Sequence, residues 1–141
     1  MKRKLFCEIS PLTYRISTKK EILMRKIRDL PLRGKFARVK QEELLPVRIK
    51  KHASLIRRRL GNVDMQLQEN KAVNLSLGAP CIDRVLIRPG EIFSFWTLVG
   101  DPSARRGFRD GLVIAGGKTG SGVAGGMCQF TNLIHWMVLH S

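Results

Sequence analysis

The sequence is poor in cysteine, aromatic and acidic residues and has no long hydrophobic run, and each shortage excludes a class of protein. No window of about 18 or more uncharged apolar residues occurs, which excludes a membrane-spanning helix. Cys7, Cys81 and Cys128 are odd in number and form no C-x-x-C pair. We therefore expect neither a disulfide framework nor a zinc knuckle. No other ligand spacing or cofactor motif is present, so we expect no metal and no cofactor.

The amino acids that are present are those of a small globular protein. The 141 residues are 43% hydrophobic and 26% charged, which suits one domain and not a disordered chain. The N-terminus is basic like that of a signal peptide, but Glu8, Arg15 and Lys19 interrupt the apolar run that should follow. We therefore expect no secretory signal and a cytoplasmic location, with the inner membrane surface as an alternative.

The net charge of +15 is concentrated in the first part of the chain. Residues 1–60 hold 19 Lys and Arg against five Asp and Glu, whereas residues 61–141 hold seven against six and 12 of the 13 glycines. Such a basic segment suits an anionic membrane surface or an anionic substrate as well as an ordinary solvated surface. Nucleic acid is disfavoured as a partner, because few aromatic residues accompany the basic ones and no zinc-finger or RNP-type motif occurs.

The basic half contains one clear helical pattern. Thr18 and Glu21 are spaced as a capping box, and the apolar positions after them predict an amphipathic helix that ends at Pro31 and Gly34. Its charged face suits a membrane surface, although packing on a core is the commoner arrangement for such a helix. A second short helix is predicted over Gln41–Leu45, and residues 47–60 have no clear period and are predicted as strand or loop.

Two further helices are predicted in the glycine-rich half. One runs from Gln66 to Ala79 and closes before Pro80. The other runs from Met127 to Leu139 and carries an apolar stripe that we expect to be buried, with Trp136 as a core residue. Between them, strand patterns occur at Val85–Ile87, at Ile92–Trp96 and at 112–114, where Gly116 and Gly117 would form a hairpin turn. This order of helices and strands predicts an α+β domain.

The segment Gly120–Gln129 carries the most chemical information. A glycine-rich loop leads directly into a helix whose first turn contains Cys128. The unpaired N–H groups and positive dipole end of a helix stabilise a thiolate. We therefore take Cys128 as a candidate nucleophile, the amides of Gly125 and Gly126 as a candidate oxyanion or anion site, and Gln129 as a supporting donor. A buried structural cysteine and a phosphate-binding nest are the alternatives.

No histidine is a convincing base for this cysteine. His135 lies seven residues after Cys128, about 10 Å along the helix axis, which is too far for a direct hydrogen bond. Arg105 and Arg106 form a small basic loop that is a candidate for binding a phosphate or carboxylate, with a solvated loop as the alternative.

Three blocks of this sequence resemble the VanW family, the accessory proteins named from B-type vancomycin-resistance gene clusters. They are Glu69-Asn70-Lys71 with the following Asn74 helix, the Arg-Pro-Gly-Glu run at 88–91 with Phe93-Ser-Phe95, and Gly125-Gly-Met-Cys-Gln129. The resemblance implies a basic, partly helical extension over 1–61 and a VanW-like domain over 62–141. Ala124 stands where the family usually has the first of three glycines. Family members also continue into a histidine-rich segment, so the resemblance implies a domain that lacks its C-terminal part.

The resemblance implies an accessory role in glycopeptide resistance and in the cell envelope, in which the protein acts on or binds a peptidoglycan precursor. Whether it is an enzyme is left open. One alternative is a non-catalytic module that binds anionic lipid or diphosphate-linked precursors. Another is an inactive fragment that self-associates through an uncovered apolar face of the last helix.

Overall fold

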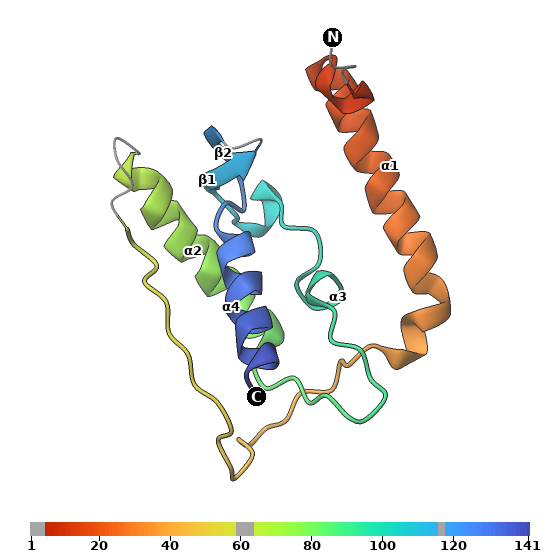
Figure 1. Cartoon of the computed structure of the whole chain (residues 1–141), viewed down its shortest axis with the longest axis vertical. Helices are drawn as coiled ribbons and strands as arrows, with labels where there is room; N and C mark the ends of the chain where they lie inside the picture. Colours follow the sequence, from red (N-terminus) through yellow and green to blue (C-terminus); the bar gives the residue numbers. More distant parts are fainter. Residues whose placement is uncertain (1–4, 59–63, 116–117) are drawn as a thin grey trace.

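The computed structural model describes residues 5–58, 64–115 and 118–141. Four helices and one hairpin make up most of it (Figure 1): α1 (Pro11–Asp29), α2 (Met65–Ile82), α3 (Phe95–Val99), α4 (Met127–Leu139) and the strands β1 (Asp110–Ala115) and β2 (Lys118–Val123). Short 3₁₀ turns are η1 (Phe6–Glu8), η2 (Leu30–Lys35) and η3 (Ala104–Arg106). The α+β class predicted from the sequence is confirmed. None of the described helices is long and apolar enough to cross a bilayer.

Helix α1 begins eight residues before the predicted capping box. Ser10 is its N-cap and accepts a hydrogen bond from the Thr13 amide, while the Thr13 hydroxyl accepts one from the Ser10 amide. The predicted start at Thr18 is therefore wrong. Because Thr18 lies in the helix interior, its hydroxyl donates to the Tyr14 carbonyl and does not cap. The predicted end near Pro31 is confirmed, since the α-helix stops at Asp29 and continues only as η2.

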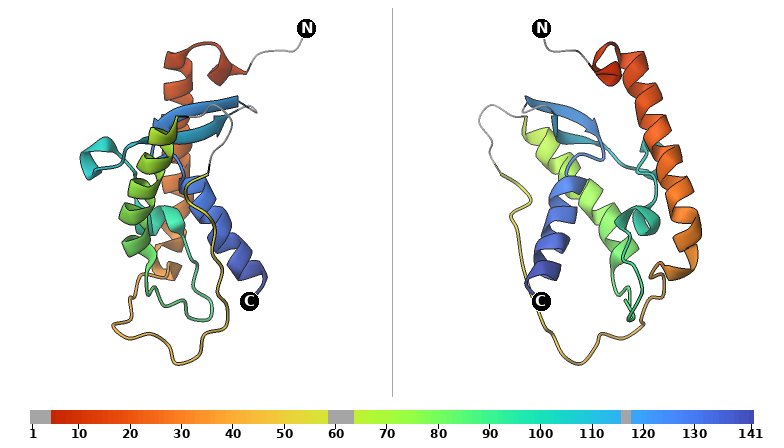
Figure 2. Two further views of the ribbon diagram at one scale, coloured as in Figure 1. Left: turned by 90° about the vertical axis from the view of Figure 1, so that its left-hand side faces the viewer. Right: turned by 45° about the vertical axis from the view of Figure 1, so that its right-hand side comes forward.

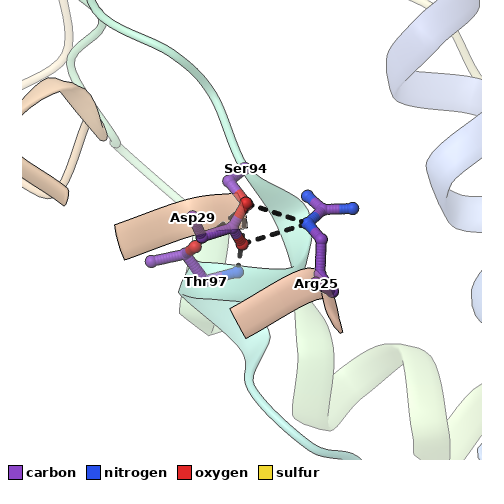
Figure 3. A network of polar contacts seen from close by, with 4 residues as sticks. All are labelled: Arg25, Asp29, Ser94 and Thr97. Atoms are coloured by element: carbon purple, nitrogen blue, oxygen red, sulfur yellow. Dashed lines mark hydrogen bonds and ion pairs between the residues drawn. The ribbon is translucent and has the colours of Figure 1, made fainter. Parts of the chain in front are cut away.

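No residue of α1 is buried, and the helix runs along one side of the molecule (Figure 1). Its C-terminal end lies closest to the rest of the chain. Figure 3 shows Arg25 paired with Asp29, with Nε–Oδ distances of 3.0 and 3.1 Å, next to Ser94 and Thr97 at the start of α3. Asp29 and Thr97 line the same hollow together with Leu23, Ile27 and Trp96, and α1 contributes no buried residue to this contact. The expectation that this helix packs on a core is wrong.

The chain from 36 to 58 is irregular and is tied to the second half by isolated bridges. Phe36 forms a parallel bridge with Ile92, and Lys40 forms an antiparallel bridge with Val85. The helix predicted over Gln41–Leu45 does not form. The strand predicted at Val85–Ile87 is reduced to the single bridge at Val85, because the irregular segment offers no continuous partner strand.

Helix α2 is longer than predicted and includes Pro80 near its C-terminal end. The Asp83 amide still donates to the Ala79 carbonyl, so the helix closes beyond the proline. The extended pattern predicted over Ile92–Trp96 also ends early. The Ser94 hydroxyl accepts from the Thr97 amide, and this cap starts α3 at Phe95.

The predicted arm at 112–114 lies in β1, but Gly120–Val123, which the sequence assigns to a glycine-rich loop, belongs to β2 because it pairs with β1. β1 pairs antiparallel with β2, from Asp110 opposite Val123 to Ala115 opposite Lys118, and the predicted Gly116-Gly117 turn lies outside the described residues. Helix α4 has the predicted bounds, but its apolar stripe is only half-buried and Val138 is exposed. Trp136 is 38% exposed and stacks between His52 and His140, so its assignment to the core is wrong.

The core lies where the hairpin, α2, α3 and α4 meet (Figure 2). Val99, Phe108 and Ala124 are buried there, and five half-buried side chains pack around them: Leu77, Cys81, Ile82, Phe95 and Met127. Gly78 lies at the contact of α2 with α4, where a Cβ would be in van der Waals contact with the Met127 sulfur at 3.4 Å. The first turn of α4 is thereby fixed against α2.

Candidate functional site

The loop between β2 and α4 crosses the hairpin at very short range. A Cβ on Gly125 would lie 2.2 Å from the carbonyl carbon of Gly111, so only glycine fits at this crossing. Gly126 is left-handed with φ +98°, and it is the N-cap of α4. Ala124 is also left-handed, with φ 62°, although it carries a side chain. A non-glycine residue in this conformation carries steric strain that glycine would not.

Asn74 on α2 anchors the loop between β2 and α4 through side-chain hydrogen bonds. Its side chain is fully buried, and its Nδ2 donates to the Gly125 carbonyl at 3.0 Å and to the Arg109 carbonyl at 2.9 Å. Its Oδ1 accepts from the Arg109 amide at 2.8 Å. One amide side chain therefore joins α2, the start of the hairpin and the glycine loop.

Cys128 occupies the second position of α4, as the sequence predicts, and its side chain is exposed. The Gly125 amide donates to the Gly122 carbonyl and is already used within the loop. Within the described residues, the amides of Gly126 and Cys128 have no backbone acceptor. Cys128 thus occupies the first turn of a 13-residue helix, whose N-terminal N–H groups have no acceptor within the helix.

A pocket of about 390 Å³ opens beside this thiol. β1 supplies an aliphatic wall, the loop and α4 supply the polar side, and two basic side chains complete the lining. The residues are Ser54, Arg58, Lys71, Leu112, Val113, Ile114, Ala124, Gly125, Gly126, Cys128 and Gln129. Among these described residues two are cationic and none is acidic, so the lining favours a ligand that carries negative charge.

Lys71 is the unusual member of this lining. It comes from α2, is only 5% exposed, and extends beneath Gly126, where a Cβ would lie 2.1 Å from the Lys71 Cγ. Its Nζ donates to Gln129 Oε1 at 3.1 Å, and no ion pair to a carboxylate is formed among the described residues. Burial lowers the pKa of Lys71, and the charge of Arg58 lowers it further.

Lys71 belongs to a buried and mostly polar face of α2. Gln68, Lys71, Asn74 and Gly78 are buried, three or four residues apart. Neither amide atom of Gln68 has a hydrogen-bond partner within the described part of the chain. A helix with polar residues at core-facing positions is rare unless those residues bind something. That spacing is the signal in the sequence that could have identified Lys71.

The irregular segment 54–58 is anchored so that it closes one side of the pocket. Gln129 Nε2 donates to Ser54 Oγ and to the Leu55 carbonyl, both at 3.0 Å. Arg57 forms a two-point ion pair with Glu69, at 2.6 and 2.9 Å, and this pair holds the pKa of the Glu69 carboxyl below its usual value. The predicted supporting donor Gln129 therefore positions the neighbouring segment and accepts from Lys71.

Arg105 and Arg106 are not brought to the pocket. Both are exposed on η3, and Arg106 donates to the Asp101 carbonyl and lies 5.4 Å from the Phe108 ring centre. His135 is also outside the pocket lining, and it lies with Phe93 and Phe95 on another face. The structure thus joins Cys128, Gln129, Gly125 and Gly126 in one place and leaves the two arginines elsewhere.

The site is a small α+β unit in which a helix-terminal cysteine and a buried lysine line one pocket beside a glycine loop. Residues 70–141, just over half of the chain, match the family model described as VanW like protein. The chain belongs to the VanW family. All the pocket residues except Ser54 and Arg58 fall within the matched range.

Two curated relatives are similar to parts of the chain. The vancomycin B-type resistance protein VanW of Enterococcus faecalis is 47% identical over 78 residues, which is 55% of this chain and 28% of that protein. The uncharacterized protein YoaR of Bacillus subtilis is 33% identical over 66 residues, 47% of this chain and 22% of its own length. The chain thus spans less than a third of either relative. No solved structure matches.

The loop crossing predicts unequal effects on the free energy of unfolding at two neighbouring positions. Gly125→Ala should lower the free energy of unfolding by at least about 2 kcal/mol, because its Cβ meets the Gly111 backbone. Ala124→Gly should change it by less than about 1 kcal/mol, since relief of the left-handed strain offsets the added backbone entropy. Urea denaturation measures both. Equal losses in the two variants would contradict this description of the loop.

Burial of Lys71 predicts a loss of folding free energy that depends on pH. Lys71→Met should raise the free energy of unfolding at about pH 7 by about 1 kcal/mol, because a desolvated ammonium is removed. The folded chain binds fewer protons than the unfolded chain between the lowered pKa and 10.5, so wild-type stability rises with pH in that window. The advantage of the variant should therefore shrink toward about pH 10.

The control is Lys19→Met on exposed α1, which should change stability little at either pH. Urea denaturation at the two pH values is the measurement. A Lys71→Met variant that is less stable than wild type by the same amount at both pH values would show that burial of the ammonium carries no cost.

Proposed function

We propose that this chain is an accessory protein of vancomycin resistance that binds a peptidoglycan precursor in the Cys128 pocket and acts on it through that thiol. The observation that carries the proposal is the composition of the pocket: a thiol at a helix N-terminus, two cations and an aliphatic wall in one lining. The printed name of the Enterococcus relative supports the resistance role, and the matched range contains the thiol and the buried lysine.

The chemistry of the lining suits the end of a short peptide. Arg58 at the exposed side and the free amides at Gly126 and Cys128 can each bind a carboxylate or an oxyanion. Leu112, Val113 and Ile114 offer apolar contact to small aliphatic side chains. Precursor peptides of the cell wall present both features, a terminal carboxylate and methyl side chains.

A second candidate is a non-catalytic module on an anionic lipid surface, and α1 favours it. The helix has six basic residues against two acidic ones and no buried residue. Leu12, Ile16, Leu23 and Ile27 recur on one face of it and are about half exposed or more. Such a basic amphipathic helix is suited to the headgroup region of a bilayer.

The pocket proposal predicts that binding depends on one arginine and not on another. Arg58→Met should weaken binding of an acylated peptide with a free D-alanine carboxylate about fivefold, because the pocket loses an exposed cation. Arg105→Met removes the same charge from η3 and should leave the affinity unchanged. Isothermal titration calorimetry of the full chain measures both variants.

Two further measurements distinguish the peptide-binding pocket from the lipid-binding module. The same peptide with its carboxylate converted to an amide should bind weakly to the wild type. Vesicles with anionic lipid should not compete with the peptide for the pocket. Equal losses in the two arginine variants, or binding only to vesicles with a steep dependence on salt, would favour the lipid module and reject the pocket.

A further inference from the structure

A hollow of about 470 Å³ lies between α1, η2 and the start of α3, and we call it the α1 hollow. It shares no lining residue with the Cys128 pocket. Three cations line it: Lys26 from α1, Arg33 from η2 and Arg38 from the irregular chain that follows. Within the described residues none of the three forms an ion pair. Their charge is therefore available to a ligand.

The one carboxylate in this lining is already neutralised. Asp29 accepts from Arg25 Nε with both of its carboxylate oxygens, at 3.0 and 3.1 Å (Figure 3). It thus has a partner on its own helix and is not needed by the cations of the hollow. The α1 hollow keeps an excess of positive charge, which attracts an anion.

Large apolar side chains occupy most of the remaining lining. Leu23 and Ile27 on α1 and Leu30 on η2 are each about half exposed, and Trp96 on α3 is half-buried. A free inorganic anion would leave this apolar surface in contact with water, whereas a lipid would cover it. Tryptophan is also the residue type that is enriched where a bilayer meets water. The lining therefore fits a ligand with both a negative group and a hydrocarbon part.

The apolar stripe of α1, from Leu12 to Ile27, leads into this hollow, because its last two members line it. At about 3.6 residues per turn the stripe spans about 60° of the helix circumference. Lys19 and Lys20 border it on either side, and Glu21 lies on the opposite face of the helix. Basic side chains beside an apolar stripe reach lipid headgroups while the stripe enters the boundary with the acyl chains.

We propose that α1 and the α1 hollow form a docking surface for an anionic bilayer. The apolar stripe and Trp96 enter the boundary between headgroups and acyl chains, and Lys26, Arg33 and Arg38 bind a lipid phosphate. The inference rests on the lipid-surface candidate for α1 and extends it from one helix to a headgroup site. It requires no change at the Cys128 pocket, so lipid docking and peptide binding belong to separate surfaces of one chain.

Co-sedimentation of the full chain with vesicles tests the role of the arginines. Arg33→Gln combined with Arg38→Gln should weaken partitioning onto vesicles of phosphatidylcholine and phosphatidylglycerol at least about tenfold, since each cation at an anionic surface contributes about fivefold. Both side chains are exposed, so the fold should be retained. Arg48→Gln combined with Arg105→Gln removes the same charge from exposed positions outside the hollow and should stay within about twofold of wild type.

Tryptophan fluorescence tests whether the apolar part of the hollow enters the bilayer. Trp136→Phe leaves Trp96 as the only tryptophan of the full chain. On the anionic vesicles its emission should shift to shorter wavelength and be quenched by brominated acyl chains. In the matched Trp96→Phe variant the emission of Trp136, which stacks between His52 and His140, should stay unchanged. Inorganic phosphate alone should shift neither emission.

Each other outcome overturns the inference. Equal losses in the two arginine pairs would show that vesicle binding follows net charge alone. A response of Trp96 to inorganic phosphate alone would make the hollow a site for a free anion. If the Trp136→Phe chain sediments as a dimer and shows the shifted emission without vesicles, a second copy of the chain covers this surface.

These results are separable from binding at the Cys128 pocket. If the Arg33 and Arg38 variant loses vesicle binding and keeps its affinity for the peptide, the docking surface stands whatever the pocket does with that peptide. If the peptide binds with the predicted dependence on Arg58 while the wild type does not bind anionic vesicles, the pocket is correct and the docking surface is rejected.

Discussion

The geometry of the whole site depends on the buried side chain of Asn74. It makes three hydrogen bonds, two to Arg109 and one to Gly125, and it makes them from the middle of α2. A buried amide that is satisfied in this way is expensive to replace, because any apolar substitute leaves backbone groups without partners. The glycine loop, the start of the hairpin and the first turn of α4 therefore keep one position relative to α2.

The position of the loop determines the chemistry of the pocket. Because Gly125 crosses Gly111 at backbone contact and Gly126 lies on the Lys71 stem, α4 starts directly above the lysine. Cys128 then lies in the first helical turn with Lys71 in the same pocket lining. Burial lowers the pKa of Lys71, and groups with such perturbed pKa values are common at functional sites. Segment 54–58 completes the pocket through Gln129 and the Arg57–Glu69 pair.

The sequence predicted best those elements whose signals are local. The bounds of α4 followed from apolar periodicity, one arm of the hairpin followed from the apolar run at 112–114, and the cysteine in the first turn of α4 followed from the glycine run before it. The start of α1 was missed because two capping patterns compete in that stretch, and Ser10 followed by Pro11 forms the cap that is used. The strand predicted at Val85–Ile87 does not form for another reason. A strand needs a neighbouring strand to pair with, and here a single bridge joins Val85 to Lys40.

The candidate site was predictable in part, because some of its residues form a local motif in the sequence. Cys128, Gln129, Gly125 and Gly126 are contiguous, so a local motif could identify them, and the structure keeps them together. Lys71 comes from a helix more than 50 residues earlier, so no local motif places it in the same pocket lining as Cys128. Arg105 and Arg106 show the converse error, because a basic pair near the motif in sequence lies on η3, away from the pocket.

The most direct test of this account is the cost of replacing Asn74, measured by urea denaturation against a matched position on the same helix. Asn70 also donates from Nδ2 to a hairpin carbonyl, that of Asp110 at 2.7 Å, but it is partly exposed and makes one such bond. The account predicts that Asn74→Leu lowers the free energy of unfolding by at least about 3 kcal/mol and Asn70→Leu by about 1 kcal/mol. Equal costs at the two positions would contradict the claim that Asn74 holds the site together.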